Sequence, residues 1–93
     1  MSVAGWPPIL VLGRDTCEDT TRSRAHLAAR EIPFAYRNVE LDAEADAMNR
    51  SYNAGVRVTP VILIGDPVPP GRVVIEPSND ELDAAIAEVA AAG

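Results

Sequence analysis

A single cysteine is the residue best suited to chemistry in this chain of 93 residues. Cys17 follows the short apolar run of residues 9–12 and directly precedes a segment, beginning at Glu18, whose lack of Pro and Gly predicts a helix. The first backbone amides of a helix favour negative charge, so a thiol placed there tends to ionise to the reactive thiolate. Because Cys17 is the only cysteine, any disulfide would join it to a thiol from another molecule.

The neighbours of Cys17 act on its pKa in opposite directions. The hydroxyl of Thr20 can donate a hydrogen bond to a thiolate, which lowers the pKa. The carboxylates of Glu18 and Asp19 suit the helix dipole, but they repel a thiolate. The dipole contributes about 0.3–1 kcal/mol, and one pKa unit corresponds to about 1.4 kcal/mol. The carboxylates can therefore cancel the dipole, and Arg14 can offset one of them, so the sign of the net effect stays open.

The charge and composition of the chain argue against several classes of protein. The net charge is −6 and no basic cluster stands out, which argues against nucleic acid or an anionic membrane as the main partner. No apolar run approaches the roughly 18 residues of a membrane span, and residues 1–8 do not resemble a signal peptide. We therefore expect one cytoplasmic domain over residues 1–93. A single cysteine and a single histidine cannot form a zinc cluster, and we expect His26 to pack or lie at the surface.

The hydrophobic pattern predicts an α/β chain with the element order β-α-β-α-β-β-α. The expected strands are residues 9–12, 34–39, 61–64 and 72–75, and the expected helices are residues 18–30, 41–52 and a last one that runs to about residue 91 from the Ser78–Glu81 capping box. Residues 65–71 are expected to form a turn. Each expected helix has an inner face that should pack on the sheet. In the helix over residues 18–30 it consists of Thr20, Ser23, Leu27 and Ala28, and in the helix over residues 41–52 of Leu41, Ala45, Met48 and Tyr52. In the last helix it consists of Leu82, Ala85, Ile86 and Val89.

The order of the elements also predicts the topology. The first two strands should be parallel with a right-handed crossover, and the last two should form an antiparallel hairpin. The result is a mixed four-stranded sheet flanked by three helices, with helices on both faces. In this topology Cys17 and the Thr59-Pro60 pair lie at strand ends on the same edge of the sheet.

The element order, the position of Cys17 after the first strand and the turn over residues 58–60 resemble the glutaredoxins of the thioredoxin-like superfamily. From Cys17 to Glu40 the register matches that family without a gap. Residues 53–60 and 76–78 are most similar to the mycoredoxin-like, monothiol members from actinobacteria. The resemblance covers nearly the whole chain and implies a thioredoxin-like fold.

The resemblance implies a role for each matching position. Cys17 would attack a mixed disulfide, with Thr20 beside it and Arg14 at a position that is often basic. The peptide bond before Pro60 would be cis, and the backbone there would pair with a thiol ligand whose carboxylate is held at the start of the last helix. The residues implied to contact that ligand are Val58, Thr59, Pro60, Ser78, Asn79 and Asp80.

The implied co-substrate is a low-molecular-weight thiol such as mycothiol or glutathione, with no tightly bound cofactor and no metal. The implied partner is a disulfide-containing protein or a small-thiol mixed disulfide. We expect a monomer, and a dimer bridged through Cys17 stays open.

Several positions depart from the family pattern. Thr20 stands where the family has a second cysteine or a serine, and a threonine cannot resolve a disulfide. The Glu18-Asp19 pair is acidic, so we expect Cys17 to be less activated than in a typical glutaredoxin. Glu31 stands at a frequent glycine position, which costs about 1 kcal/mol if that position needs a positive φ. Glu76 and Pro77 replace paired glycines: Glu76 repels a carboxylate, and Pro77 lacks an N–H donor.

Four functions remain open from the sequence. The first is a monothiol oxidoreductase that acts through Cys17. The second is a redox-inactive adaptor with a thioredoxin-like fold, favoured by the acidic pair and the missing second cysteine. A dimer that holds an iron–sulfur cluster through one cysteine per chain is a weaker idea. An arsenate-reductase-like enzyme would need arginines near the thiol, for which Arg57 and Arg72 are the candidates.

Overall fold

The fold of the chain is known from a computed structural model, which describes residues 5–65 and 70–92. The elements follow in the predicted order, with small differences at their ends. They are β1 (Ile9–Gly13), α1 (Glu18–Ala29), β2 (Ala35–Asn38), α2 (Ala43–Ser51), β3 (Val61–Ile64), β4 (Arg72–Ile75) and α3 (Asn79–Ala92). Within the described residues, no helix is long and apolar enough to cross a membrane. The middle of the predicted turn over residues 65–71 lies outside the described residues.

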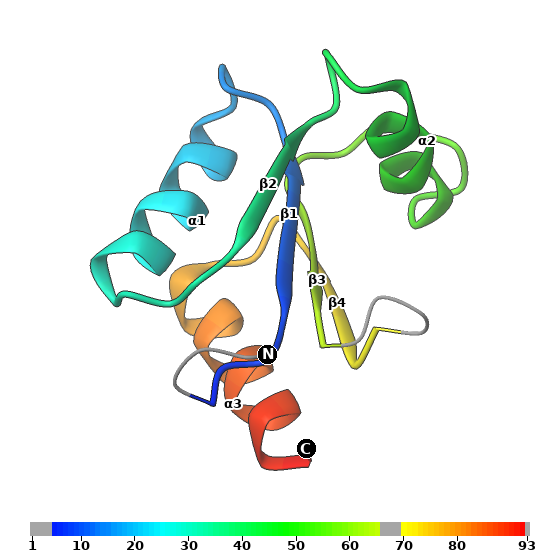
Figure 1. The fold of residues 1–93 in the computed structure, drawn as a ribbon. Helices are drawn as coiled ribbons and strands as arrows, with labels where there is room; N and C mark the ends of the chain where they lie inside the picture. The colour runs from blue at the N-terminus through cyan, green and yellow to red at the C-terminus, as the bar shows by residue number, and fades with distance from the viewer. Residues whose placement is uncertain (1–4, 66–69, 93) are drawn as a thin grey trace.

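The four strands form one mixed sheet in the order β2-β1-β3-β4 (Figure 1). β1 pairs with β2 in parallel and with β3 in antiparallel fashion, and β3 and β4 form an antiparallel pair. The parallel first pair and the antiparallel last pair are therefore confirmed. In the β1–β3 register Leu12 faces Val61, so the end of β1 lies beside the start of β3. This register determines which loops meet at that edge.

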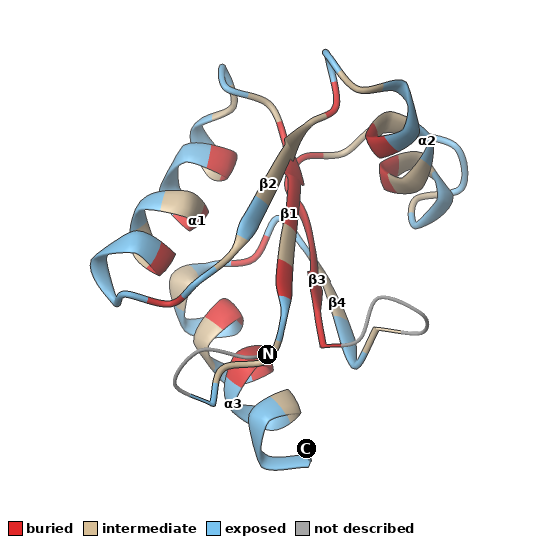
Figure 2. Ribbon diagram, viewed as in Figure 1, coloured by how far each residue is buried: buried red, intermediate tan, exposed pale blue. Residues whose placement is uncertain are grey.

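Helices cover both faces of the sheet, as predicted. α1 and α3 lie on one side and α2 lies on the other (Figure 1). Each side has its own apolar core because successive strand residues point to opposite faces. The strands β1 and β3 are the most deeply buried part of the molecule (Figure 2). The core under α1 and α3 contains Ile9, Val11, Leu27, Ile32, Ile62, Ile64, Leu82, Ala85 and Ile86, and the core under α2 contains Leu12, Val39, Ala45, Val61 and Leu63.

Three residues that were predicted to lie on the inner faces of α1 and α2 are exposed instead. Leu41 is 85% exposed and Tyr52 is 36% exposed. The cause for Leu41 is the side chain of Asp42, which accepts a hydrogen bond from the amide of Ala45 at 3.1 Å and so begins the helix after Leu41. Tyr52 is the C-cap residue of α2. Ala28, near the end of α1, is also exposed rather than buried.

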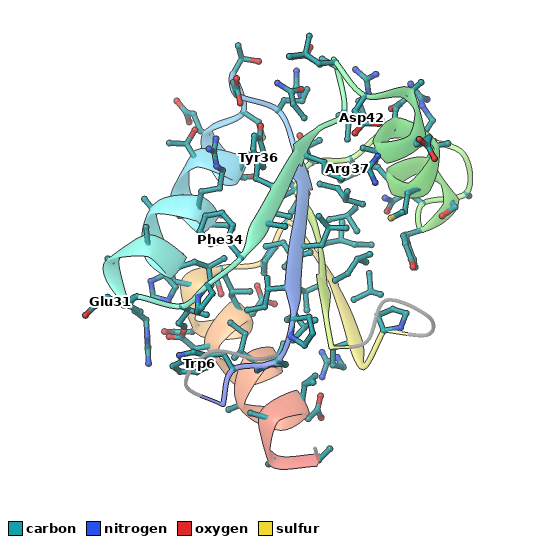
Figure 3. All side chains as sticks on the ribbon, viewed as in Figure 1. Trp6, Glu31, Phe34, Tyr36, Arg37 and Asp42 are labelled. Carbon is teal, nitrogen blue, oxygen red and sulfur yellow. The ribbon has the colours of Figure 1, made fainter. Side chains whose placement is uncertain are left out.

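The end of α1 is built on a left-handed residue that is not glycine. Glu31 has φ 56°. The amide of Ile32 donates to the carbonyl of Leu27 at 2.9 Å, and the amide of Glu31 donates to that of Ala28 at 3.0 Å, which is the Schellman arrangement. Ile32 and Leu27 are both in the core, so this end of the helix is fixed by packing as well. Glu31 lies at the far end of α1 from the β1–α1 loop (Figure 3).

Replacing Glu31 by glycine should stabilise the fold, since glycine adopts a positive φ without the steric cost of a Cβ. We expect E31G to raise the free energy of unfolding by about 0.5–1 kcal/mol, measured by denaturant titration. The control A25G, at an exposed interior position of the same helix, should lower it by about 1 kcal/mol. A loss of stability in E31G would contradict this account of the helix end.

Candidate active site

Cys17 lies in the turn between β1 and α1, at the edge where β1 ends. Its amide donates to the carbonyl of Arg14 at 3.2 Å, which closes the turn, and its carbonyl accepts from the amide of Thr21 at 3.0 Å, which begins the helix. Cys17 is the N-cap residue of α1 with φ −89° and ψ 122°, and its side chain makes no capping hydrogen bond. The thiol is only partly buried, so it is accessible from solvent.

The thiol contacts the segment that leads into β3. Its Sγ donates to the backbone carbonyl of Thr59 at 3.5 Å. The Thr59–Pro60 peptide bond is cis, and both residues are buried. The Nε of Arg14 donates to the hydroxyl of Thr59 at 3.4 Å, so the loop before α1 and the start of β3 are joined twice. The structure thus brings together Cys17, Arg14, Thr59 and Pro60 from the predicted set.

Thr20 lies beneath the same loop because residue 13 is a glycine. A Cβ built on Gly13 would lie 2.4 Å from Cγ2 of Thr20, which no real side chain could occupy. Thr20 is fully buried, and its hydroxyl accepts a hydrogen bond from the amide of Arg14 at 3.4 Å. The close approach of Gly13 therefore holds the Thr20 hydroxyl under the cysteine loop. Nothing in the local sequence pattern marks Gly13 for this role, because it depends on the packing of Thr20 against it.

A buried asparagine on α2 holds the segment before Pro60. The Nδ2 of Asn49 donates to the carbonyl of Val58 at 2.6 Å, and its Oδ1 accepts from the amide of Val58 at 3.1 Å. Asn49 is fully buried, although it is polar. Sequence reasoning missed Asn49. The available signal was its position four residues after Ala45, which places an amide on the inner face of a predicted helix.

Burial and hydrogen bonding shift the pKa of Cys17 in opposite directions. Burial of the sulfur alone raises the pKa. The Thr59 and Thr20 side chains and the backbone amides of Thr20 and Asp19 are donors that favour the thiolate more strongly, so the pKa of Cys17 lies below its ordinary value. The thiol donates to the Thr59 carbonyl, and on ionisation these hydroxyls and amides are the groups that can donate to the sulfur.

The carboxylates of Glu18 and Asp19 interact mainly with groups other than the Cys17 thiol. Asp19 forms an ion pair with Arg22 at 2.9 Å. The Nη2 of Arg22 also donates to the carbonyl of Pro77 at 3.3 Å, which ties α1 to the turn before α3. Glu18 is exposed, where water screens its charge. The geometry thus explains how the thiolate is favoured despite two carboxylates nearby.

A shallow pocket of about 220 Å³ opens beside the thiol. The predicted residues Arg14, Cys17, Val58 and Thr59 contribute to its lining, but Ser78, Asn79 and Asp80 do not. Its remaining lining residues are Asp19, Arg57 and Glu76. Arg57 was considered in the sequence only for an arsenate-reductase-like site. Arg72, the other candidate for such a site, pairs with Glu88 on α3 and does not line this pocket.

Arg57 is held in place from α2. Its Nε donates to Asp46 at 2.8 Å, and the same carboxylate accepts from Arg50 at 3.0 Å. The hydrogen bonds from Arg57 and Arg50 hold the pKa of Asp46 below its usual range. The Arg57 guanidinium at the pocket is therefore oriented by a carboxylate on its far side.

The start of α3 is closed by its own side chains. The hydroxyl of Ser78 accepts from the amide of Glu81 at 3.1 Å, and Glu81 accepts from the amide of Ser78 at 2.8 Å, so the predicted capping box is confirmed. The hydrogen bonds to Ser78 lower the pKa of Glu81. A helix start that already carries Asp80 and Glu81 in its first turn is a poor place for a ligand carboxylate.

Within residues 5–65 and 70–92, no group of three or more His, Cys, Asp or Glu side chains could hold a metal ion. No family model, curated protein or solved structure matches the chain.

Removing the Thr20 hydroxyl should raise the pKa of Cys17, because that hydroxyl stabilises the thiolate. We expect T20V to show the rise in a titration of thiolate absorbance against pH, with alkylation of Cys17 at mildly acid pH slowed about threefold. The control T21V changes the exposed neighbouring threonine and should titrate like the wild type. An unchanged titration in T20V would show that the hydroxyl does not act on the sulfur.

Removing the Asn49 amide should loosen the segment before Pro60, because the amide and the carbonyl of Val58 lose their partners. We expect N49A to lower the free energy of unfolding by about 1–3 kcal/mol and to slow alkylation of Cys17. The control N53A removes a single 3.3 Å bond to the Asn49 carbonyl and should cost much less. Equal losses in N49A and N53A would contradict the role assigned to Asn49.

Proposed function

We propose that this chain is a monothiol thiol–disulfide oxidoreductase of glutaredoxin type, with a thioredoxin-like layout of its sheet and helices. One observation carries the proposal: the only thiol lies at the start of α1, 3.5 Å from the Thr59 carbonyl that precedes a cis proline. The lowered pKa of Cys17 supports it, because the thiolate is the form that attacks a disulfide.

In the first step the Cys17 thiolate attacks one sulfur of a mixed disulfide between a substrate thiol and a small thiol. A bond forms between Cys17 and the small thiol, the old S–S bond breaks, and the substrate leaves as a thiolate. The Thr59 and Thr20 hydroxyls and the first-turn amides stabilise the negative charge before attack. As the charge leaves Cys17, the carbonyl of Thr59 remains beside the new disulfide.

In the second step a second molecule of the small thiol attacks the sulfur of the small thiol bound to Cys17. The Cys17 thiolate is released, and the small thiol leaves as its symmetric disulfide. Overall, one free small-thiol molecule is consumed for each substrate thiol released, because the other half of the product disulfide comes from the original mixed disulfide. Mycothiol and glutathione are the candidate reductants, and a reducing cytoplasm would supply either. This cycle needs no second protein cysteine, so Thr20 can serve as a donor instead.

The direct test is the reduction of a peptide–small-thiol mixed disulfide by catalytic amounts of the protein, with glutathione or mycothiol as reductant. We expect C17S to lose activity by about 100-fold or more, because an alcohol is a far weaker nucleophile at neutral pH. The control T16S changes the exposed residue before the cysteine and should retain wild-type turnover.

An unreactive wild-type protein, or a C17S variant with full activity, would refute the proposal. An inert Cys17 that nevertheless binds a protein partner stably would instead support the redox-inactive adaptor, for which the acidic Glu18-Asp19 pair is the motivating feature.

A further inference from the structure

Glu76 is held beside the thiol site by contacts on both sides. Its backbone amide donates to the carbonyl of the cis-proline Pro60 at 2.9 Å. The next residue, Pro77, is buried, and its carbonyl accepts from Arg22 at 3.3 Å. Glu76 itself has φ 48°, a conformation that favours glycine. The chain therefore places a carboxylate, rather than a bare glycine backbone, at the rim of the pocket that Cys17 lines.

The other charges around this pocket are compensated to different degrees. Asp19 is paired with Arg22, and Arg57 is paired with Asp46. The Nε of Arg14 donates to the neutral hydroxyl of Thr59, and Arg14 makes no ion pair with the described residues, so its positive charge also stays uncompensated. Among the described residues Glu76 makes no ion pair. Its carboxylate is therefore the negatively charged group of the pocket that can still pair with a ligand.

The charges at the neighbouring start of α3 favour the same kind of ligand. The amides of Ser78 and Glu81 are used within the capping box, and Pro77 has no N–H to offer. The first turn of α3 adds the carboxylates of Asp80 and Glu81. A ligand carboxylate at this end of the pocket would meet repulsion from these side chains, whereas an ammonium group would meet attraction from Glu76.

Resting on the function proposed above, we propose that the pocket beside Cys17 selects disulfides of small aminothiols, whose ammonium group pairs with Glu76. The pocket, at about 220 Å³, is below the roughly 300 Å³ at which sites for drug-sized ligands begin, which suits a short thiol. In the exchange the Cys17 thiolate attacks the disulfide, an S–S bond forms to one aminothiol, and the other aminothiol leaves as a thiolate. The ammonium group takes no part in the bond changes and serves to orient the disulfide.

The experiment measures the rate at which Cys17 forms a mixed disulfide, by intact mass, with three disulfides of different charge. Cystamine carries only ammonium groups, 2-hydroxyethyl disulfide is neutral, and glutathione disulfide has a net negative charge because its carboxylates outnumber its ammonium groups. Each rate is divided by the rate of the same disulfide with the thiolate of 2-mercaptoethanol, which removes intrinsic reactivity. We expect the corrected rate for cystamine to exceed that for the neutral disulfide about fivefold, and glutathione disulfide to be slowest. High salt should shrink the preference.

The E76Q variant tests the assigned partner, because it removes the charge and keeps the shape. We expect its corrected preference for cystamine over the neutral disulfide to fall close to one. The matched control is E31Q, since Glu31 is another exposed glutamate with a positive φ. It lies at the end of α1 that is far from the Cys17 loop (Figure 3). The E31Q variant should keep the wild-type preference.

The outcomes separate this inference from the function on which it rests. Exchange with the neutral disulfide but no preference for cystamine, or a preference that E76Q retains, would overturn the aminothiol inference and leave the oxidoreductase intact. A Cys17 that exchanges with none of the three disulfides would overturn both.

Discussion

The antiparallel pairing of β1 with β3 is the constraint on which the site depends. Its register sets Leu12 opposite Val61, so the loop that follows β1 must lie against the segment that precedes β3. One loop carries the thiol and the other carries the cis proline, and Cys17 and Thr59 are 42 residues apart in the chain. The pairing is buried between two apolar cores, one on each face of the sheet, which makes this edge a rigid frame. The 3.5 Å contact from Cys17 to Thr59 follows from it.

The pKa of Cys17 depends more on hydrogen-bond donors close to the sulfur than on the formal charges of nearby side chains. Counting charges alone, the Glu18-Asp19 pair should oppose a thiolate. The structure turns Asp19 toward Arg22 and leaves Glu18 in water, while the Thr20 hydroxyl is fixed under the loop by the bare Cα of Gly13. Hydrogen bonds to a charged group act at contact distance, whereas exposed carboxylates are screened. This difference explains why the pKa of Cys17 falls.

The sequence predicted the order of the elements, the pairing of the first and last strand pairs and the position of Cys17, because these follow from local periodicity and chain connectivity. It placed Leu41 wrongly because periodicity does not show which acidic residue caps a helix. It missed Asn49 and the structural role of Gly13, and it considered Arg57 only for an arsenate-reductase-like site, because the contacts of these residues arise only when distant segments meet. Ser78 was predicted both as a helix cap and, by resemblance, as a ligand contact; the cap is confirmed, and the ligand contact stays a prediction.

The folded chain is expected to hold Cys17 as a more stable thiolate than the unfolded chain does. The most direct measurement is the rate of alkylation of Cys17 against pH, in the folded protein and in the same protein unfolded by denaturant. Because the chain has one cysteine, both profiles report the same sulfur. We expect the inflection of the folded protein to lie at lower pH than that of the unfolded one. An inflection at the same or a higher pH would contradict it and would mean that burial and the acidic neighbours outweigh the hydroxyl and amide donors.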